Sequence, residues 1–200
     1  MVDAQLIEKF RDGDIDAFNL LVKRWEKNVF NFVLRYMGDR EESKDVCQQT
    51  FVRTYRKLNR LKEPEKFSTW LYQIAINICR DELKKRNRRK THSLQQLEDK
   101  SNGLENHLSK LNPGDRTHPE NEVYQNDLAQ LLNRALQTIP EEQRLVIIMK
   151  EYQGLKFTEI ADVLKTPVNT VKSRMYYGLR ALRKVFEKWN IQEEMLKNEV

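Results

Sequence analysis

Residues 154–180, GLKFTEIADVLKTPVNTVKSRMYYGLR, decide the fold of the C-terminal part of this chain. Apolar side chains recur at helical spacing on both sides of Lys165, which predicts a short helix capped by Thr158, a tight turn and a longer helix that starts at Thr166 and Pro167. This pattern is typical of a helix-turn-helix, whose second helix enters the major groove of DNA. A three-helix bundle without DNA is the alternative, because Lys165 stands where many such turns carry glycine.

The longer helix has two contrasting faces. The face that we expect to be buried carries Val168, Val171, Met175, Gly178, Leu179 and Leu182. The opposite face and its flanks carry Asn169, Thr170, Lys172, Ser173, Arg174, Tyr176, Tyr177 and Arg180. Upstream, another helix is expected behind Pro140, with an apolar side made of Leu145, Val146, Ile148 and Met149.

Three further helices are predicted in the N-terminal part. The first covers residues 15–36 and ends at Gly38. The second covers residues 41–58, with an apolar face of Val46, Cys47, Thr50, Phe51, Tyr55 and Leu58. Within that face, Cys47 is most simply a small core residue. The third begins near Ser68 or Thr69, either of which could cap it, and ends at about Arg86.

The third of these helices separates an apolar face from a polar stripe. At about 100° per residue, the stripe consists of Gln73, Asn77, Arg80 and Lys84, with Trp70 at its edge. Six of the seven residues at positions 84–90 are basic. Positive charge attracts phosphate, and amide and aromatic groups bind unpaired bases. We therefore interpret the stripe as a nucleic-acid surface, against the simpler interpretation of a solvated helix face.

Charge divides the chain into three blocks. Residues 1–90 carry a net charge of +7, residues 91–122 carry −3 and residues 123–200 carry +2, within a total of +6. The middle block contains two glycines, two prolines and all three histidines, without a sustained apolar period. It is expected to be an acidic, flexible linker between two helical domains, long enough for them to occupy well-separated surfaces.

Composition excludes several classes of protein. No apolar run is close to about 18 residues, the length that a membrane-spanning helix needs. The start of the sequence also lacks the pattern of a signal peptide, so we expect a cytosolic chain. Two cysteines and three histidines, without zinc-ligand spacing, indicate neither a disulfide framework nor a metal site. Few glycines and prolines, together with 33% charged residues, favour an all-α protein.

Several segments, taken in their order along the chain, resemble the extracytoplasmic-function (ECF) branch of the bacterial RNA polymerase sigma factors. They are Gly13-Asp14 with Asp16-Ala17-Phe18, then residues 45–53 (DVCQQTFVR), residues 67–77 (FSTWLYQIAIN) with Arg80-Asp81, Ile139-Pro140-Glu141, and residues 154–174. Each segment is a weak pattern by itself, but their order and the intervening linker match the family over nearly the whole chain.

The resemblance implies a role for each segment. Residues 1–90 would bind core polymerase and recognise and melt the minus-10 promoter element, and residues 123–200 would recognise the minus-35 element. The core-binding residues implied are Asp45, Gln48, Gln49 and Arg53. The minus-10 residues implied are Lys62, Lys66, Ser68, Thr69, Trp70, Gln73, Asn77, Arg80 and Lys84. The minus-35 residues implied are Thr158, Asn169, Thr170, Lys172, Ser173, Arg174, Tyr176, Tyr177 and Arg180.

The resemblance also implies the partners. These are the clamp helices of the largest polymerase subunit, the flap of the second subunit, and promoter DNA, while the linker would enter the RNA channel. The sequence leaves open whether an anti-sigma factor holds the chain inactive.

We therefore interpret the sequence as an all-α, two-domain initiation factor that directs polymerase to promoters and promotes strand opening. No hydrolytic triad, phosphate-binding glycine loop or pair of metal carboxylates can be assembled, so we expect no enzyme activity, cofactor or small-molecule substrate. The alternatives are a stand-alone helix-turn-helix regulator and a purely structural helical adaptor.

Overall fold

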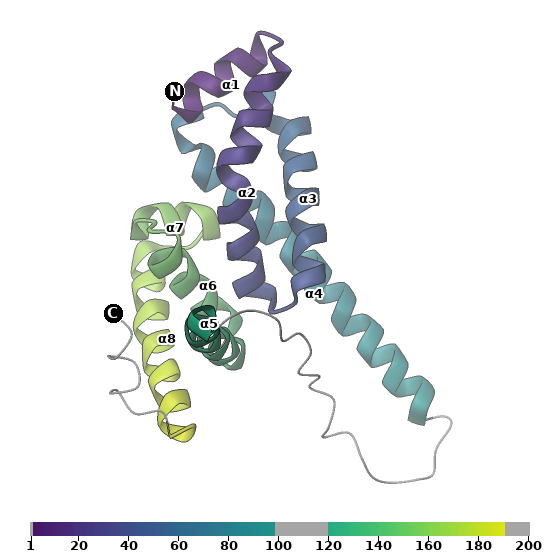
Figure 1. The fold of residues 1–200 in the computed structure, drawn as a ribbon, viewed down its shortest axis with the longest axis vertical. Coiled ribbons are helices and arrows are strands. Elements are labelled where there is room, and N and C mark those ends of the chain that lie inside the picture. The colour runs from purple at the N-terminus through teal and green to yellow at the C-terminus, as the bar shows by residue number, and fades with distance from the viewer. Residues whose placement is uncertain (1, 99–119, 191–200) are drawn as a thin grey trace.

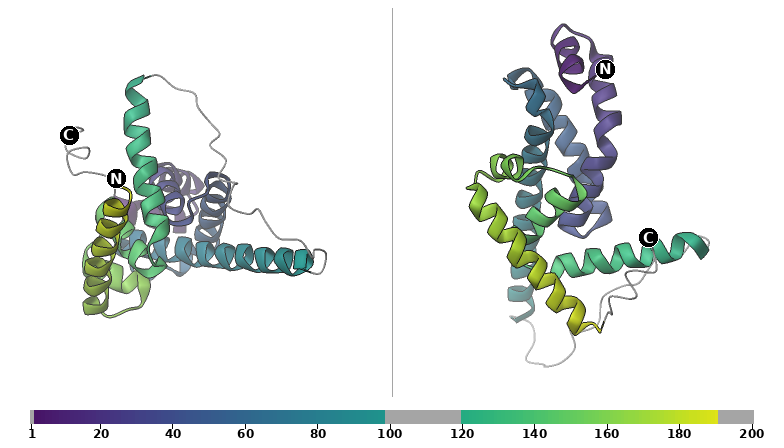
Figure 2. Two further views of the ribbon diagram at one scale, coloured as in Figure 1. Left: turned by 90° about the horizontal axis from the view of Figure 1, so that it is seen from below. Right: turned by 90° about the vertical axis from the view of Figure 1, so that its left-hand side faces the viewer.

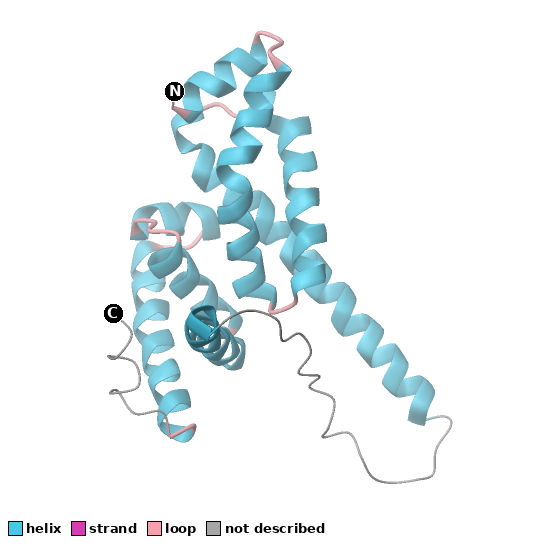
Figure 3. Cartoon of the chain, viewed as in Figure 1, coloured by secondary structure: helices cyan, strands magenta, loops and turns pink. Residues whose placement is uncertain are grey.

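The computed structural model describes residues 2–98 and 120–190. Within these ranges the chain forms eight α-helices and no strand, which confirms the all-α class (Figures 1 and 3). The N-terminal half contains α1 (Asp3–Arg11), α2 (Ile15–Met37), α3 (Arg40–Lys57) and α4 (Phe67–Glu98). The C-terminal half contains α5 (Glu120–Thr138), α6 (Glu141–Ile147), α7 (Phe157–Leu164) and α8 (Val168–Lys188). None of the helices in the described ranges is long and apolar enough to cross a lipid bilayer.

The N-terminal bundle consists of α2, α3 and α4, with α1 packed against α2 at one end (Figure 1). Asp14 and Asp39 precede α2 and α3, and their carboxylates accept hydrogen bonds from Ala17 N at 3.2 Å and Glu42 N at 2.8 Å. These caps satisfy backbone donors that the first turns leave unpaired. Gly38 ends α2 with φ 76°, a left-handed conformation that glycine adopts without strain.

Helix α4 differs from its expected extent at both ends. It begins at Phe67, directly after a 3₁₀ turn at Pro64–Lys66, so neither Ser68 nor Thr69 is its capping residue. It continues past Arg86 to Glu98, the last described residue before position 99, because residues 87–98 contain neither glycine nor proline to stop it. The first eight residues of the expected linker are therefore helical, while residues 99–119 lie outside the described part of the chain.

The C-terminal bundle contains the expected helix-turn-helix. Helix α7 ends at Lys165, which takes the left-handed conformation with φ 51° and ψ 48°, and α8 follows behind Pro167. The expected cap of α7 is wrong, because Thr158 lies inside the helix. Instead Lys156 precedes the helix, and its backbone N–H donates to Glu159 Oε2 at 2.6 Å. Helix α6 continues into a π-helical segment, η3 (Ile148–Tyr152).

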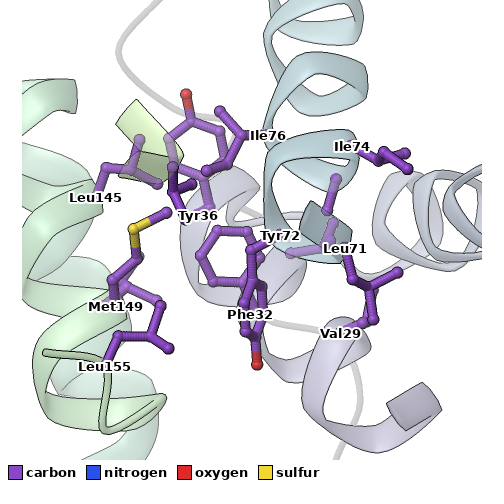
Figure 4. Packing of buried hydrophobic residues seen from close by; sticks show 14 of the residues in the cluster. Val29, Phe32, Tyr36, Leu71, Tyr72, Ile74, Ile76, Leu145, Met149 and Leu155 are labelled. Atoms are coloured by element: carbon purple, nitrogen blue, oxygen red, sulfur yellow. The ribbon is translucent and has the colours of Figure 1, made fainter. Parts of the chain in front are cut away.

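The two halves pack against each other through one continuous apolar core. Tyr72 and Ile76 of α4 are each 2% exposed although they lie beside the polar stripe of that helix. Figure 4 shows Leu145, Met149 and Leu155 of the C-terminal half facing the side chains of the N-terminal half around Tyr72. The sequence allowed the halves to sit apart, whereas the structure joins them.

Polar contacts also join the two halves at this interface. The Tyr72 hydroxyl donates to Gln153 Oε1 at 2.5 Å, and Gln137 Nε2 donates to the carbonyl oxygen of Arg35 at 2.8 Å. The Arg35 guanidinium also lies 4.1 Å from the centre of the Tyr152 ring, a cation–π arrangement. The buried aromatic rings thus keep partners for their polar atoms.

One residue of α8 that was expected in the core, Leu179, is exposed. Val171, Met175, Gly178 and Leu182 are buried, as predicted, but Leu179 is 48% exposed.

We expect Leu182→Ala to lower the free energy of unfolding by about 2–5 kcal/mol because it leaves a cavity. Leu179→Ala on the same helix should change it by less than about 0.5 kcal/mol. Urea denaturation of both variants measures the difference, and equal losses would contradict this assignment of faces.

Candidate nucleic-acid interface

The exposed face of α8 presents most of the side chains expected at duplex DNA. Asn169, Lys172, Ser173, Tyr176, Tyr177 and Arg180 are exposed, and Thr170 is half-buried. Thr158 is exposed near the start of α7. The rings of Tyr176 and Tyr177 meet edge to face with centres 5.5 Å apart. This surface combines hydrogen-bond donors and acceptors with positive charge, as base-edge and phosphate contacts require.

Arg174 has a different environment from its expected neighbours. It is half-buried, and its guanidinium forms an ion pair with Glu142 of α6 and a hydrogen bond to Thr166 Oγ1 at 3.5 Å. In this arrangement it joins α8 to α6 and the turn instead of pointing freely outward. A role at DNA would require Arg174 to exchange the Glu142 carboxylate for a phosphate or a base.

The polar stripe on α4 forms the second candidate surface. Asn77 and Lys84 are exposed, whereas Gln73 and Arg80 are half-buried. Trp70 is also half-buried, with its ring centre 6.2 Å from that of Phe67. The stripe therefore holds together as predicted, with its aromatic member packed partly into the core.

The loop before α4 supplies the remaining residues expected in this surface. Lys62 and Lys66 are exposed, and Ser68 and Thr69 are half-buried in the first turn of the helix. Lys66 Nζ lies 2.7 Å from Glu63 Oε2, and this hydrogen-bonded pair raises the pKa of Lys66. The ammonium group of Lys66 is therefore paired with a carboxylate of the same loop.

The C-terminal half occupies part of the α4 surface. Helix α7 packs against α4, and Arg80 Nε of the stripe lies 3.4 Å from Glu141 Oε1 of α6. The same carboxylate oxygen accepts a hydrogen bond from the Tyr36 hydroxyl. Burial, reinforced by this hydrogen bond, raises the pKa of Tyr36, so the phenol remains a donor over the physiological pH range. Arg80 is thus engaged within the protein.

A groove between α2 and α3 lies on another side of the N-terminal bundle. Its volume is about 1040 Å³, and its lining is mainly apolar, with Phe18, Val22, Phe30, Phe51, Val52 and Tyr55 among the residues. Val52 and Tyr55 are each 44% exposed. Tyr55 lies on the apolar face of α3 where it was expected, but this part of the face is open to solvent. An apolar surface left open in this way is typical of a protein-binding site.

The expected core-binding residues lie along the same helix as this groove. Gln48 lines the groove, while Asp45, Gln49 and Arg53 are exposed on α3 but do not line it. Val52 lines the groove one helical turn from Gln48, although it was not among the core-binding residues expected there. Repetition of apolar residues at that spacing identifies a face, but does not distinguish a buried face from an open one.

Cys47 also lines the groove. Burial raises the pKa of its thiol to about 11, which keeps it protonated and unreactive near neutral pH. This environment agrees with its interpretation as a small packing residue. Within the described residues, no group of three or more His, Cys, Asp or Glu side chains is arranged to hold a metal ion.

Comparisons with known proteins match both halves of the chain. The family model for Sigma-70 region 2 matches residues 21–89, and that for Sigma-70 region 4 matches residues 129–182. The RNA polymerase sigma-H factor of Pseudomonas aeruginosa is 32% identical over 185 residues, covering 92% of this chain and 94% of that protein. The ECF RNA polymerase sigma-E factor of Escherichia coli K12 is 34% identical over 183 residues, covering 91% and 93%.

Solved structures share the fold. CnrH, in complex with the cytosolic domain of CnrY, matches with a TM-score of 0.67 at 20% identity, covering 93% of this chain and 97% of that one. The sigma factor RpoE of Bartonella quintana, in complex with the anti-sigma factor NepR, matches with a TM-score of 0.59 at 17% identity, covering 86% and 98%.

The left-handed turn residue of the helix-turn-helix provides a test of its geometry. A non-glycine residue in this conformation is strained, so Lys165→Gly should raise the free energy of unfolding by about 1 kcal/mol. Lys184→Gly, inside α8, should lower it by about 1 kcal/mol. Urea denaturation measures both changes, and a loss of stability in Lys165→Gly would show that the turn has another conformation.

Proposed function

The chain belongs to the ECF sigma factors of bacterial RNA polymerase, and we propose that each of its three surfaces makes a different contact during transcription initiation. The α4 stripe acts at the minus-10 element, the α8 face acts at the minus-35 element, and the α2–α3 groove receives core polymerase. The observation that carries this proposal is the presence of two separate polar, basic faces, one in each sigma region, beside one open apolar groove.

In this proposal the groove binds the clamp helices of the largest polymerase subunit. Exposed apolar side chains such as Val52 and Tyr55 provide the area that a helical partner would bury, and Gln48 provides a polar contact inside the groove. Asp45, Gln49 and Arg53 would lie at the rim, where charged and amide groups set orientation more than affinity.

The α4 stripe would hold unpaired bases of the minus-10 element. Asn77 is exposed and its amide can donate and accept at a base edge, while Trp70 and Gln73 stand beside it. Arg80, Lys84, Lys62 and Lys66 would supply phosphate contacts. Ser68 and Thr69 complete the start of the helix next to the same bases.

The α8 face would lie in the major groove of the minus-35 element. Lys172, Ser173 and Tyr176 are exposed near the start of the helix, which is the part that reaches base edges in this motif. Asn169, Thr170, Tyr177, Arg180 and Thr158 would surround them, and Arg174 would join after leaving Glu142. The flap of the second polymerase subunit would hold this domain in place.

Simultaneous contact with both promoter elements requires the two halves to separate. The centres of the elements lie about 25 base pairs apart, or about 85 Å at 3.4 Å per base pair. In the structure α7 packs directly on α4, and helices in contact have axes only about 10 Å apart. We therefore propose that the structure is the closed form of the free protein and that core polymerase and promoter DNA stabilise an open form.

The remaining expectations become parts of this proposal. Residues 1–90 and 123–200 act as the two promoter-binding domains, and residues 91–122 connect them, with α4 extending into that segment. The factor acts in the cytoplasm with polymerase and performs no catalysis of its own. An anti-sigma factor is a further candidate partner, because a protein of the same fold binds one.

A charged residue in the groove tests the polymerase-binding surface. We expect Val52→Glu to weaken core binding by at least about 10-fold, because a carboxylate would be buried against an apolar partner. Leu20→Glu is the matched control, since Leu20 is a 53% exposed apolar residue of α2 outside the groove lining. Titration of labelled core polymerase with each variant gives the affinities, and equal effects of both substitutions would exclude the groove.

Footprinting with and without core polymerase tests the proposed function against a stand-alone helix-turn-helix regulator. The closed protein should bind duplex DNA weakly and without sequence preference, because its two promoter-binding surfaces cannot contact both promoter elements at the same time. Addition of core polymerase should give protection that depends on the promoter. Strong protection of a palindromic site by the protein alone would instead support the stand-alone regulator.

A further inference from the structure

The far end of α4 carries positive charge that the minus-10 stripe does not account for. Six of the seven residues at positions 84–90 are basic. Two of these side chains have acidic partners on the protein. Lys85 Nζ lies 2.7 Å from Glu82 Oε1, and Arg86 Nη1 lies 3.3 Å from Glu42 Oε2.

Arg88 and Arg89 are in a different situation. Both are exposed, and neither forms an ion pair with any of the residues that the structure describes. Figures 1 and 2 show that the end of α4 extends away from the other helices. Like charges gathered on a projecting helix repel one another, which favours a polyanionic partner.

The helical register connects Arg88 to the minus-10 stripe. Eleven residues separate Asn77 from Arg88, which at about 100° per residue places Arg88 within about 20° of Asn77 around the helix. The rise between them is about 16 Å, or about five base pairs of duplex. A helix whose Asn77 contacts an unpaired base would therefore bring Arg88 next to the DNA that flanks the melted segment.

Domain closure affects the two ends of α4 differently. Arg80 is engaged by Glu141 of the C-terminal half, and Tyr72 and Ile76 are covered by it. Arg88 and Arg89 lie two to three helical turns farther along and remain exposed in the same structure. The closed form thus leaves this end of α4 open to a ligand while Arg80 of its stripe is engaged by Glu141.

We propose that Arg88 and Arg89 form a duplex-DNA phosphate site, distinct from the base-recognising stripe and available before the domains open. This inference rests on the proposed function, since it assigns the first, sequence-independent contact to one place on the same helix. Guanidinium groups bind phosphate oxygens in bidentate geometry, and such contacts position a protein on DNA without recognising its sequence. The site would hold the free factor on DNA and later grip the duplex beside the opened bases.

The salt dependence of binding gives the expected size of the effect. Each phosphate contact contributes about −0.9 to the slope of log K against log salt. Loss of two contacts should therefore make the slope less negative by about 2. Across a fourfold rise in salt, the double variant should lose about 10-fold less affinity than the unchanged protein.

The test compares R88Q/R89Q with K9Q/K23Q, in which two exposed lysines of α1 and α2 are neutralised. Fluorescence anisotropy with the full chain and a labelled non-promoter duplex gives the affinity from about 50 mM to about 200 mM salt. We expect R88Q/R89Q to weaken binding and flatten the slope by about 2, with K9Q/K23Q near the unchanged protein. Equal behaviour of the two variants would overturn the proposal, because net charge alone would then explain the binding.

A parallel measurement separates this inference from the proposed function. Footprinting of the unchanged protein with core polymerase on a promoter tests the sigma-factor assignment without reference to Arg88 or Arg89. If promoter protection is present and R88Q/R89Q binds duplex DNA normally by itself, only the inference fails. Loss of affinity for core polymerase with unchanged duplex binding would likewise overturn it, and would assign the basic end of α4 to an acidic protein surface.

Discussion

The rest of the structure depends on the burial of two neighbouring sides of α4. One side, with residues such as Leu71, Ala75 and Ile78, packs into the N-terminal bundle. The other side places Tyr72 and Ile76 against the C-terminal half. The polar stripe borders the second of these sides, so the C-terminal half that covers Tyr72 and Ile76 also reaches Arg80 of the stripe. Under the proposed function, a helix in this position couples the packing of the two domains to the freedom of Arg80 to bind nucleic acid.

The composition of the interface suits a contact that can open. Tyr36, Tyr72 and Gln137 bring polar atoms that are hydrogen-bonded across the interface when it is closed and can be hydrated when it is open. Glu141 accepts from Tyr36 and contacts Arg80, and both of these groups can exchange the carboxylate for water or, for Arg80, for phosphate. A purely apolar interface would pay a larger hydration cost on opening. The closed form therefore does not need to be a permanent one.

The sequence predicted the elements better than their partners. Gly38 and the period of apolar residues located α2, and the same reasoning located the helix-turn-helix around Lys165. The sequence did not show that Tyr72 and Ile76 are covered by the C-terminal half. It also did not show that Tyr55 and Leu179 are exposed, because helical periodicity identifies apolar positions without saying what packs against them. The residues of the α4 stripe and of the α8 face came from helical periodicity, whereas the core-binding residues and those of the loop before α4 came from the family resemblance. The contacts of all of them with polymerase and DNA remain predictions.

The location of the groove constrains how the protein can open. Its lining comes from residues 15–30 of α2 and 44–56 of α3, whereas the interface between the halves uses Arg35 and Tyr36 farther along α2. A partner that occupies only the groove makes the same contacts in the closed and open forms, and a ligand with equal affinity for two states does not shift their populations. Opening must therefore be driven by contacts that exist only in the open form. Under the proposed function, those contacts are made by the α4 stripe with Arg80 released from Glu141 and by a C-terminal domain held at a distance. Promoter DNA and a second polymerase contact would then contribute the free energy that clamp binding alone cannot supply.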